Sequence, residues 1–186
     1  MGKITLITGG QRSGKSSYAS KLATGLSTHP IYLATSRIWD DDHKERIKRH
    51  QQDREKEWVT VEEEKFISSH NWNGNTVVMD CVTLWLTNFL FDEQQHVEKC
   101  LKQAKEEVKN ILQQNTHFIM VTNELGMGAF PDNRLQIKFN DLQGWMNQFI
   151  AELAEEVILM VSGIPVILKK TSSEYKDYDI SKKRPS

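Results

Sequence analysis

The chain has 186 residues, and 24 Lys and Arg residues stand against 25 Asp and Glu, which gives a formal net charge of −1 at pH 7. This length predicts one domain with its own core, and 38% hydrophobic with 26% charged residues is typical of a folded protein rather than a disordered one. The lack of a basic surplus argues against general binding to nucleic acid. No apolar run approaches the roughly 20 residues of a membrane span, and no signal-peptide pattern opens the chain, so we expect a cytoplasmic protein.

Runs rich in Val, Ile and Leu alternate with segments of helical character, which predicts an α/β fold with a mostly parallel sheet flanked by helices. We expect strands at residues 3–8, 31–34, 76–80, 118–122 and 157–161, with a short extra strand at 58–61. A last apolar run, residues 165–168, follows so closely that it can only pair antiparallel, through a turn at 162–164. The sheet should therefore end in a C-terminal antiparallel edge hairpin.

Helices are expected at residues 15–26, 40–57 and 82–91, and two further helices carry apolar stripes with a spacing of three and four residues. One stripe is Val97, Leu101, Ala104, Val108 and Ile111. The other is Leu135, Phe139, Leu142, Met146, Phe149 and Leu153. Both stripes are interpreted as core contacts. Residues 171–186 lack an apolar period, so we divide the chain into a single domain at 1–170 and a polar tail.

The most specific signal is the segment at residues 9–16, Gly-Gly-Gln-Arg-Ser-Gly-Lys-Ser, which matches G-x-x-x-x-G-K-[ST] between a predicted strand and a predicted helix. Glycines let backbone N–H groups wrap around a polyphosphate, and the start of the following helix adds further donors. Lys15 would neutralise the β- and γ-phosphates, and the Ser16 hydroxyl would bind Mg²⁺. The alternative, a glycine-rich turn with a structural role only, leaves the agreement of strand, turn and helix unexplained. The motif therefore makes the predicted α/β fold P-loop NTPase-like.

Asp80 ends the apolar segment Val77-Val78-Met79 and resembles the acidic residue that completes the metal site of P-loop enzymes. It also stands directly before a predicted helix, where a carboxylate can simply cap the helix. Given the P-loop, we favour the metal role.

The predicted helix at 40–57 is crowded with charges, and its simplest interpretation is a solvated face with ion pairs. A second interpretation gives it chemistry, because a neutral imidazole can attack phosphorus and nearby arginines can balance the phosphate charge. His50 has Arg46, Arg49 and Arg54 close by in sequence. His43 lies seven residues earlier on the same helical face, and the periodicity does not choose between the two histidines.

Several separated blocks together resemble the bifunctional adenosylcobinamide kinase/adenosylcobinamide-phosphate guanylyltransferase family of cobalamin biosynthesis. They are the P-loop, residues 32–36 (Tyr-Leu-Ala-Thr-Ser), Arg46-Ile47 with His50 and Arg54, residues 121–128 (Val-Thr-Asn-Glu-Leu-Gly-Met-Gly), 131–134 (Pro-Asp-Asn-Arg) and 161–165 (Val-Ser-Gly-Ile-Pro). The resemblance runs from about residue 3 to residue 168. It implies phosphorylation of the aminopropanol hydroxyl of adenosylcobinamide, and then transfer of GMP from GTP with release of pyrophosphate.

The resemblance also implies roles for individual residues. His50 matches the histidine that carries GMP, and with Lys15 it forms the expected catalytic pair. The implied ligands are GTP and ATP as substrates with Mg²⁺ held by Ser16 and Asp80, and the implied assembly is a homo-oligomer, a trimer in relatives. The nucleotide-binding residues that it implies are Gly9, Gly10, Gln11, Arg12, Ser13, Gly14, Lys15, Ser16, Ala34, Thr35, Ser36, Gln51, Gln52, Asp53, Arg54, Glu62 and Asp80.

The sequence departs from the family at two places. Position 80 is Asp where relatives carry Glu, which shortens the reach of the carboxylate by one methylene. Residues 51–53, Gln-Gln-Asp, differ from the residues most common at these positions in the family. Glu124 and Arg134 stand in or after the glycine-containing segment 123–128, which is either a corrinoid contact or a polar loop without chemistry.

Other functions remain as alternatives from the residues alone. One is a P-loop kinase for another small hydroxylated metabolite, without guanylyl transfer. Another is a non-enzymatic guanine-nucleotide switch, but Asn123 is followed by Glu124 and Leu125 rather than by the Asn-Lys-x-Asp pattern of such switches. A nucleic-acid-dependent ATPase is disfavoured by the balanced charge.

Overall fold

The structure is a computed structural model and describes residues 1–37, 58–128 and 131–171. Within these residues one sheet has the strand order β3-β2-β4-β5-β1-β6-β7. Its elements are, in chain order, β1 (Lys3–Gly9), α1 (Lys15–Leu26), β2 (Ile31–Ala34), β3 (Val59–Glu62), the short 3₁₀ helix η1 (Ile67–Ser69), β4 (Thr76–Asp80), α3 (Val82–Asp92), α4 (Val97–Ile111), β5 (His117–Val121), α5 (Arg134–Leu153), β6 (Glu156–Val161) and β7 (Ile164–Lys170).

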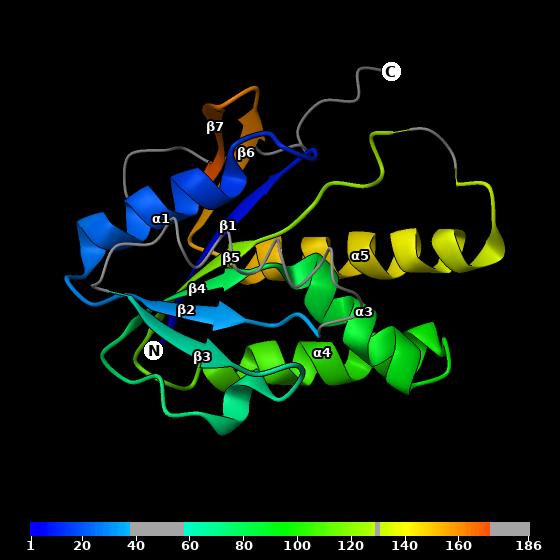
Figure 1. The fold of residues 1–186 in the computed structure, drawn as a ribbon, viewed down its shortest axis with the longest axis horizontal. Coiled ribbons are helices and arrows are strands. Elements are labelled where there is room, and N and C mark those ends of the chain that lie inside the picture. Colours follow the sequence, from blue (N-terminus) through cyan, green and yellow to red (C-terminus); the bar gives the residue numbers. More distant parts are fainter. Residues whose placement is uncertain (38–57, 129–130, 172–186) are drawn as a thin grey trace, which may run out of the picture.

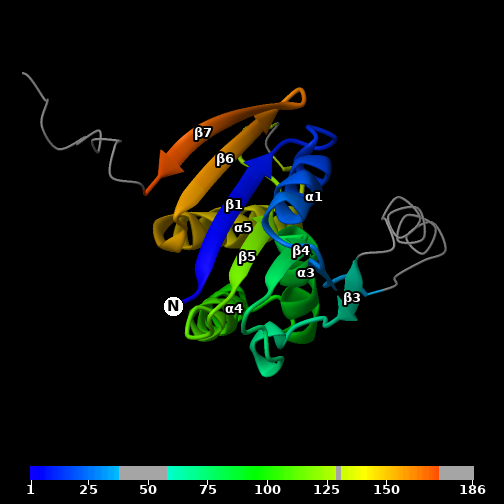
Figure 2. The ribbon, with the colours of Figure 1, turned by 90° about the vertical axis from the view of Figure 1, so that its left-hand side faces the viewer.

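All neighbouring strands from β3 to β6 pair in parallel, and β7 alone runs antiparallel, against β6. Helix α1 covers one face of the sheet, and α3, α4 and α5 cover the other (Figure 1). Figure 2 shows the sheet between these two layers, with β7 at one edge and β3 at the other. The predicted fold class, a mostly parallel sheet flanked by helices and closed by an antiparallel edge hairpin, is confirmed.

Strand β1 is buried on both faces, and its side chains alternate between two apolar clusters. Ile4 and Leu6 pack into the large cluster formed with α3, α4 and α5. Ile7 packs into a smaller cluster with Ala19 and Ala23 of α1. Burial on both sides explains why the strand is a continuous apolar run in the sequence. It also holds the end of β1, where the P-loop begins, at the centre of the sheet.

The predicted strand boundaries shift slightly. The short strand expected at 58–61 is β3, one residue later, and β5 begins one residue earlier than expected because His117 pairs with Lys3 and Thr76. The expected turn at 162–164 is shorter, since Ile164 already pairs with Val161. Two residues in the left-handed region suffice for such a hairpin turn, and Ser162 and Gly163 have φ of 51° and 83°.

The apolar stripe of α5 was predicted to lie in the core along its whole length, and at its ends this is wrong. Leu135 and Leu153 are 38% and 37% exposed, whereas the middle of the helix is buried through Leu142 and Met146. The reason is length: the 20 residues of α5 span about 30 Å, and the strands beneath it have five to seven residues, about 17–23 Å. The first turns of α5 therefore extend past the sheet.

Two sequence predictions lie outside the described residues, namely the charged helix at 40–57 and residues 172–186 of the polar tail. In the described part of the chain, no helix is both long enough and apolar enough to cross a membrane.

Candidate functional site

The P-loop connects the end of β1 to the start of α1, as predicted. Arg12 and Gly14 take left-handed conformations, with φ of 56° and 95°. Lys15 is only 8% exposed, and its Nζ donates a hydrogen bond of 2.6 Å to the carbonyl oxygen of Gly10. Burial lowers the pKa of Lys15, while Cys81 and Asp80 at the end of β4 oppose that shift. The sheet thus brings the end of β4 close to the P-loop, although the two are far apart in the sequence.

The start of α1 has donors to offer to an anion. Its capping residue, Gly14, provides no side-chain hydrogen bond, and no acidic residue lies in the first turn. The first N–H groups of a helix lack partners within the helix, and the helix dipole favours negative charge there. Two further polar atoms near the loop, Thr8 Oγ1 and Ser13 Oγ, are buried without a hydrogen-bond partner. Buried polar atoms are normally paired, so these features fit a bound phosphate group.

The β6–β7 hairpin packs directly against the P-loop. The N–H of Gly163 donates to the carbonyl oxygen of Ser13 at 2.9 Å. A Cβ on Gly14 would lie 3.3 Å from Gly163 Cα, and a Cβ on Gly9 would lie 2.5 Å from the carbonyl oxygen of Met160. The close approach of this hairpin therefore favours glycine at positions 9 and 14. This reason is separate from the access that glycines give a bound phosphate to the loop backbone.

Asp80 ends β4 and does not cap the following helix, because the N-cap position of α3 is Cys81 and has no side-chain cap hydrogen bond. This excludes the capping alternative. Together with the Ser16 hydroxyl, the Asp80 carboxylate offers hard oxygen ligands, which Mg²⁺ prefers. Among the residues that the structure describes, no group of three or more His, Cys, Asp and Glu side chains could hold a metal ion. Two protein ligands, Ser16 and Asp80, are enough for Mg²⁺, because this ion usually takes its other ligands from substrate phosphates and water.

The segment after β2, which contains the predicted nucleotide residues Ala34, Thr35 and Ser36, is held next to the end of β4. Thr35 is fully buried, and its hydroxyl donates to the carbonyl oxygen of Cys81 at 3.2 Å. The buried amide of Asn88 on α3 donates to the Thr35 carbonyl oxygen at 2.6 Å and to the Glu64 carbonyl oxygen at 2.9 Å. These bonds place the exits of β2 and β3 at the same edge of the sheet as Asp80.

Glu62 lies apart from the P-loop. It ends β3, where it is exposed and pairs with Ala34. Four strand spacings separate β3 from β1 in the sheet order, which corresponds to about 19 Å. The structure thus brings Glu62 to the end of β2 and not to the phosphate loop. The other predicted residues, His50, Gln51, Gln52, Asp53 and Arg54, lie outside the described residues.

An ion-pair cluster that the sequence did not reveal lies after β2 and β3. Arg37 forms a bidentate pair with Asp92, Nη1 to Oδ1 at 2.6 Å and Nη2 to Oδ2 at 2.8 Å, and it also pairs with Glu64. Lys65 Nζ lies 2.9 Å from Asp92 Oδ2. The hydrogen bonds from Arg37 and Lys65 hold the pKa of Asp92 well below its usual range. No spacing rule relates these residues, because only the packing of α3 beside the segments that follow β2 and β3 brings them together.

A buried polar network connects the end of β5 to α5. Asn147 Oδ1 accepts from Thr122 Oγ1 at 2.7 Å and from Gln143 Nε2 at 2.9 Å. Asn147 Nδ2 donates to the carbonyl oxygen of Asn123, whose own side chain donates to Thr83 Oγ1 of α3 at 3.1 Å. Two amides four residues apart on the apolar side of a helix are the sequence signal that could have revealed this network.

Several hollows lie around α5. One, of about 360 Å³, lies between α3 and the first turns of α5 and is lined by Thr87, Leu90, Phe91, Gln95, Asn133, Leu135, Gln136 and Phe139. A second, of about 350 Å³, is lined by Leu125, Gly126, Gly128, Pro131, Ile137, Asn140 and Asp141.

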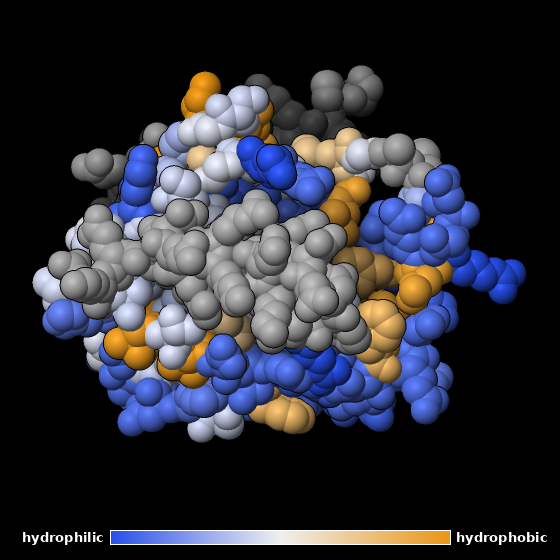
Figure 3. Space-filling model, viewed as in Figure 1, coloured by the Kyte–Doolittle hydropathy of each residue, from blue (hydrophilic) through white to orange (hydrophobic). Residues whose placement is uncertain are grey.

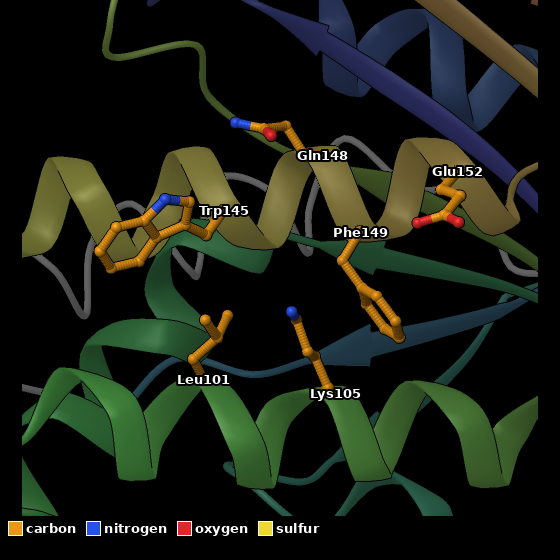
Figure 4. Close-up of a pocket in the computed structure, with 6 residues that line it drawn as sticks. All are labelled: Leu101, Lys105, Trp145, Gln148, Phe149 and Glu152. Atoms are coloured by element: carbon orange, nitrogen blue, oxygen red, sulfur yellow. The ribbon is translucent and has the colours of Figure 1, made fainter.

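A third hollow lies further along, between α4 and α5 (Figure 4). Leu101 and Lys105 of α4 face Trp145 and Phe149 of α5 across it, and Lys105 Nζ lies 5.0 Å from the centre of the Phe149 ring.

Comparison with known proteins places this geometry in a family. The family described as cobinamide kinase / cobinamide phosphate guanyltransferase matches residues 5–168. The bifunctional adenosylcobalamin biosynthesis protein CobU of Escherichia coli (strain K12) is 39% identical over 181 residues, covering 89% of this chain and 99% of that protein. CobU of Salmonella typhimurium is 36% identical with the same coverage.

The fold also resembles that of a solved protein from Pyrococcus horikoshii. The TM-score is 0.53 at 10% identity, and the match covers 92% of this chain and 88% of that one. At this identity the likeness concerns the fold alone. The family match and the two relatives span nearly the whole chain, and the chain therefore belongs to the cobinamide kinase / cobinamide phosphate guanyltransferase family.

Proposed function

We propose that this protein phosphorylates the aminopropanol hydroxyl of adenosylcobinamide and then transfers GMP from GTP to the resulting phosphate. The observation that carries this proposal is a P-loop whose buried Lys15 bonds to the loop carbonyl of Gly10, in a chain that matches the family over residues 5–168. The products are adenosylcobinamide-GDP and pyrophosphate.

In the kinase step, the substrate hydroxyl oxygen attacks the γ-phosphorus of a nucleoside triphosphate and displaces the nucleoside diphosphate. The P-loop N–H groups and the first turn of α1 bind the phosphate oxygens. Lys15 exchanges its bond to the Gly10 carbonyl for the β- and γ-phosphates and offsets the charge that develops on them. Mg²⁺, held by Ser16 and Asp80, would screen the phosphate charge when bound.

In the guanylyl step, His50 attacks the α-phosphorus of GTP and pyrophosphate leaves, so that a histidine–GMP phosphoramidate forms. The substrate phosphate then attacks the same phosphorus and releases His50. Dividing the transfer into two displacements lets one nucleotide site serve two acceptors in turn. The attacking imidazole must be neutral, because only an unprotonated ring nitrogen has the lone pair that attacks phosphorus.

The residues after β2, with Gln51, Gln52, Asp53, Arg54 and Glu62, complete the nucleotide site in this proposal. Glu62 would serve the end of the nucleotide far from the P-loop, in keeping with the four strand spacings between β3 and β1. GTP and ATP are the expected phosphoryl donors and the cytoplasm the expected location.

We further propose that the chain assembles as a homotrimer. Strand β7 is an edge strand whose apolar side chains are exposed, with Ile164 at 65%, Ile167 at 52% and Leu168 at 58%. An exposed apolar edge strand is prone to pairing, and burying it against another copy would remove that hazard.

Incubation with GTP labelled at the α-phosphate tests the guanylyl step. Wild-type protein should acquire an acid-labile label that adenosylcobinamide phosphate discharges, whereas His50→Ala should stay unlabelled and still phosphorylate adenosylcobinamide. His43→Ala is the matched control and should behave like the wild type. An equal label in His50→Ala, or none in the wild type, would leave a P-loop kinase without guanylyl transfer as the better description.

A further inference from the structure

We propose that the carboxylate of Glu124 accepts the proton of the substrate hydroxyl in the kinase step. In that step the hydroxyl oxygen bonds to the γ-phosphorus, the bond from this phosphorus to the β-phosphate oxygen breaks, and the proton moves to a carboxylate oxygen of Glu124. The proton passes to solvent when the products leave. This inference rests on the proposed function and deepens it, since it assigns a catalytic group to the first of the two reactions.

The two reactions differ in whether the attacking atom carries a proton. A hydroxyl oxygen carries one, and that proton becomes strongly acidic as the bond to phosphorus forms. In the guanylyl step the attacking atoms are an unprotonated imidazole nitrogen of His50 and an oxygen of the substrate phosphate, which is already negatively charged. A positioned base therefore accelerates the kinase step, by about 10²–10⁴-fold, and has no proton to remove in the guanylyl step.

Glu124 lies directly beside the P-loop. Its N–H donates to the carbonyl oxygen of Gly9, the first residue of the P-loop motif, at 3.1 Å, so its side chain begins next to the loop. Strand β5, which precedes Glu124, stands between β1 and β4 in the sheet order. Glu124 is thus placed between the phosphate loop and Asp80, the proposed metal ligand at the end of β4. The ends of parallel strands are where open α/β sheets bind ligands.

The backbone that leads into Glu124 is fixed by two helices. The N–H of Asn123 and its Nδ2 both donate to Thr83 Oγ1 of α3, at 3.2 and 3.1 Å. The Asn123 carbonyl oxygen accepts from Asn147 Nδ2 of α5 at 3.1 Å. A general base requires such support, because a small displacement from the reacting group lowers the rate strongly.

The carboxylate of Glu124 is available as a proton acceptor. Its Oε1 accepts from the N–H of Gly126 at 3.0 Å, and a Cβ at position 126 would lie only 3.2 Å from that oxygen, so glycine leaves it room. Within the part of the chain that the structure describes, no lysine or arginine forms an ion pair with Glu124. Asp92 is the contrasting case, because Arg37 and Lys65 hold its oxygens and favour its charged form. A carboxylate without such partners accepts a proton more readily.

Other carboxylates at this edge of the sheet are less suited to the role. Asp80 is assigned to Mg²⁺, and a nearby positive charge favours the unprotonated form of a carboxylate. Glu62 ends β3, which is four strand spacings from β1. Asp141 lines a hollow beside the segment that follows β5, but it lies on α5 and not on that segment.

The P-loop can be reached from solvent. Gln11 and Arg12, within the loop, are exposed. Figure 3 shows hydrophilic surface, in blue, where the loop between β1 and α1 reaches the outside of the molecule. The substrate hydroxyl can therefore approach a bound γ-phosphate from solvent, and the abstracted proton can return there.

Glu124→Gln tests the proton transfer with little change of shape, because the amide oxygen can still accept from the Gly126 N–H. Kinase activity is measured as formation of adenosylcobinamide phosphate. Guanylyl activity is measured separately, as formation of adenosylcobinamide-GDP from added adenosylcobinamide phosphate and GTP. Glu124→Gln should slow the kinase step by about 100-fold and leave both the guanylyl rate and the affinity for GTP, measured by calorimetry, unchanged.

Asp141→Asn is the matched control, because it removes a negative charge beside the same segment, and it should leave both rates unchanged. An unchanged kinase rate in Glu124→Gln, or an equal loss in Asp141→Asn, would overturn the inference. Loss of both activities together with weaker GTP binding would also overturn it, since Glu124 would then serve the nucleotide site as a whole. The proposed function fails in a distinguishable way, when wild-type protein phosphorylates no adenosylcobinamide, and the inference then fails with it.

Discussion

The N–H of Gly163 donates a hydrogen bond of 2.9 Å to the carbonyl oxygen of Ser13, which connects the turn of the edge hairpin to the P-loop. The two residues are 150 positions apart in the sequence. Because the turn presses on the loop from outside, the hairpin determines where the loop backbone lies. The segment at 161–165, one of the blocks on which the family resemblance rests, thereby acquires a physical role.

Substituting Gly163 with Ala should weaken GTP binding several-fold. A Cβ at position 163 meets no atom within 4 Å, but φ of 83° is unfavourable for alanine by about 1–2 kcal/mol, so the turn will shift and displace Ser13. Gly74 has φ of 77° and equally open space. It lies in the turn before β4 begins, whereas Asp80 and the P-loop lie where the parallel strands end. Gly74→Ala should lose similar stability in urea unfolding yet bind GTP normally by calorimetry. Equal GTP affinities in the two variants would contradict this role of the hairpin.

Replacing Asp80 with Asn should reduce both activities by about 100-fold, because the carboxylate at the metal site is lost. Asp80→Glu should retain most activity, since relatives are expected to carry the longer acid at this position. The measurement is the rate of adenosylcobinamide phosphorylation as a function of Mg²⁺ concentration. If high Mg²⁺ leaves Asp80→Asn and wild type indistinguishable in rate and in Mg²⁺ dependence, the metal role of Asp80 is wrong.

Asn147→Leu should destabilise the protein by about 2–3 kcal/mol, because it leaves the Thr122 hydroxyl proton and the Asn123 carbonyl without their buried partner and removes one of the two acceptors of the Gln143 amide. Gln148 is the next residue on α5 and is exposed, so Gln148→Leu is the matched control and should lie within about 0.5 kcal/mol of wild type. Urea denaturation measures both. A small loss in Asn147→Leu would mean that these groups find other partners.

Much of the fold was predictable, since strands buried on both faces and helices with one apolar side leave clear periodic patterns. The P-loop was predictable because its glycines, Lys15 and Ser16 are consecutive. The Arg37–Asp92 pair was not, because it joins residues 55 positions apart that meet only when the end of α3 packs beside the segment after β2. The exposed ends of α5 were missed for a related reason: periodicity reports which side of a helix is apolar, but not how far the sheet beneath it extends.

The Arg37–Asp92–Lys65 cluster should make stability fall at acidic pH. The pKa of Asp92 is lowered by these partners, so its contribution is fully present above the unfolded-state value of about 3.9 and is lost as the pH falls below it. Between pH 5 and pH 3, wild type should therefore lose more free energy of unfolding than Asp92→Asn. Urea unfolding at a series of pH values checks this, and parallel curves for the two proteins would argue against it.

Ile167→Lys on β7 should shift the assembly toward monomers, because a charge would enter an apolar edge strand that we propose to be covered by another copy. Val59 lies on β3, at the opposite edge of the sheet, and has the same exposure of 52%. Val59→Lys should leave the assembly unchanged. Sedimentation velocity distinguishes the outcomes, and an Ile167→Lys variant that sediments like wild type would remove β7 from the interface.

The amide of Asn88 holds the backbone just after β2 and just after β3, at Thr35 and Glu64, so one side chain of α3 ties the two strand exits together. Residues 38–57 connect these two exits in the sequence. In the proposed function His50 of that connection serves the guanylyl step alone, whereas the P-loop serves both steps. Sequence change in the connection can therefore alter one activity while the groups that the other activity needs stay in place.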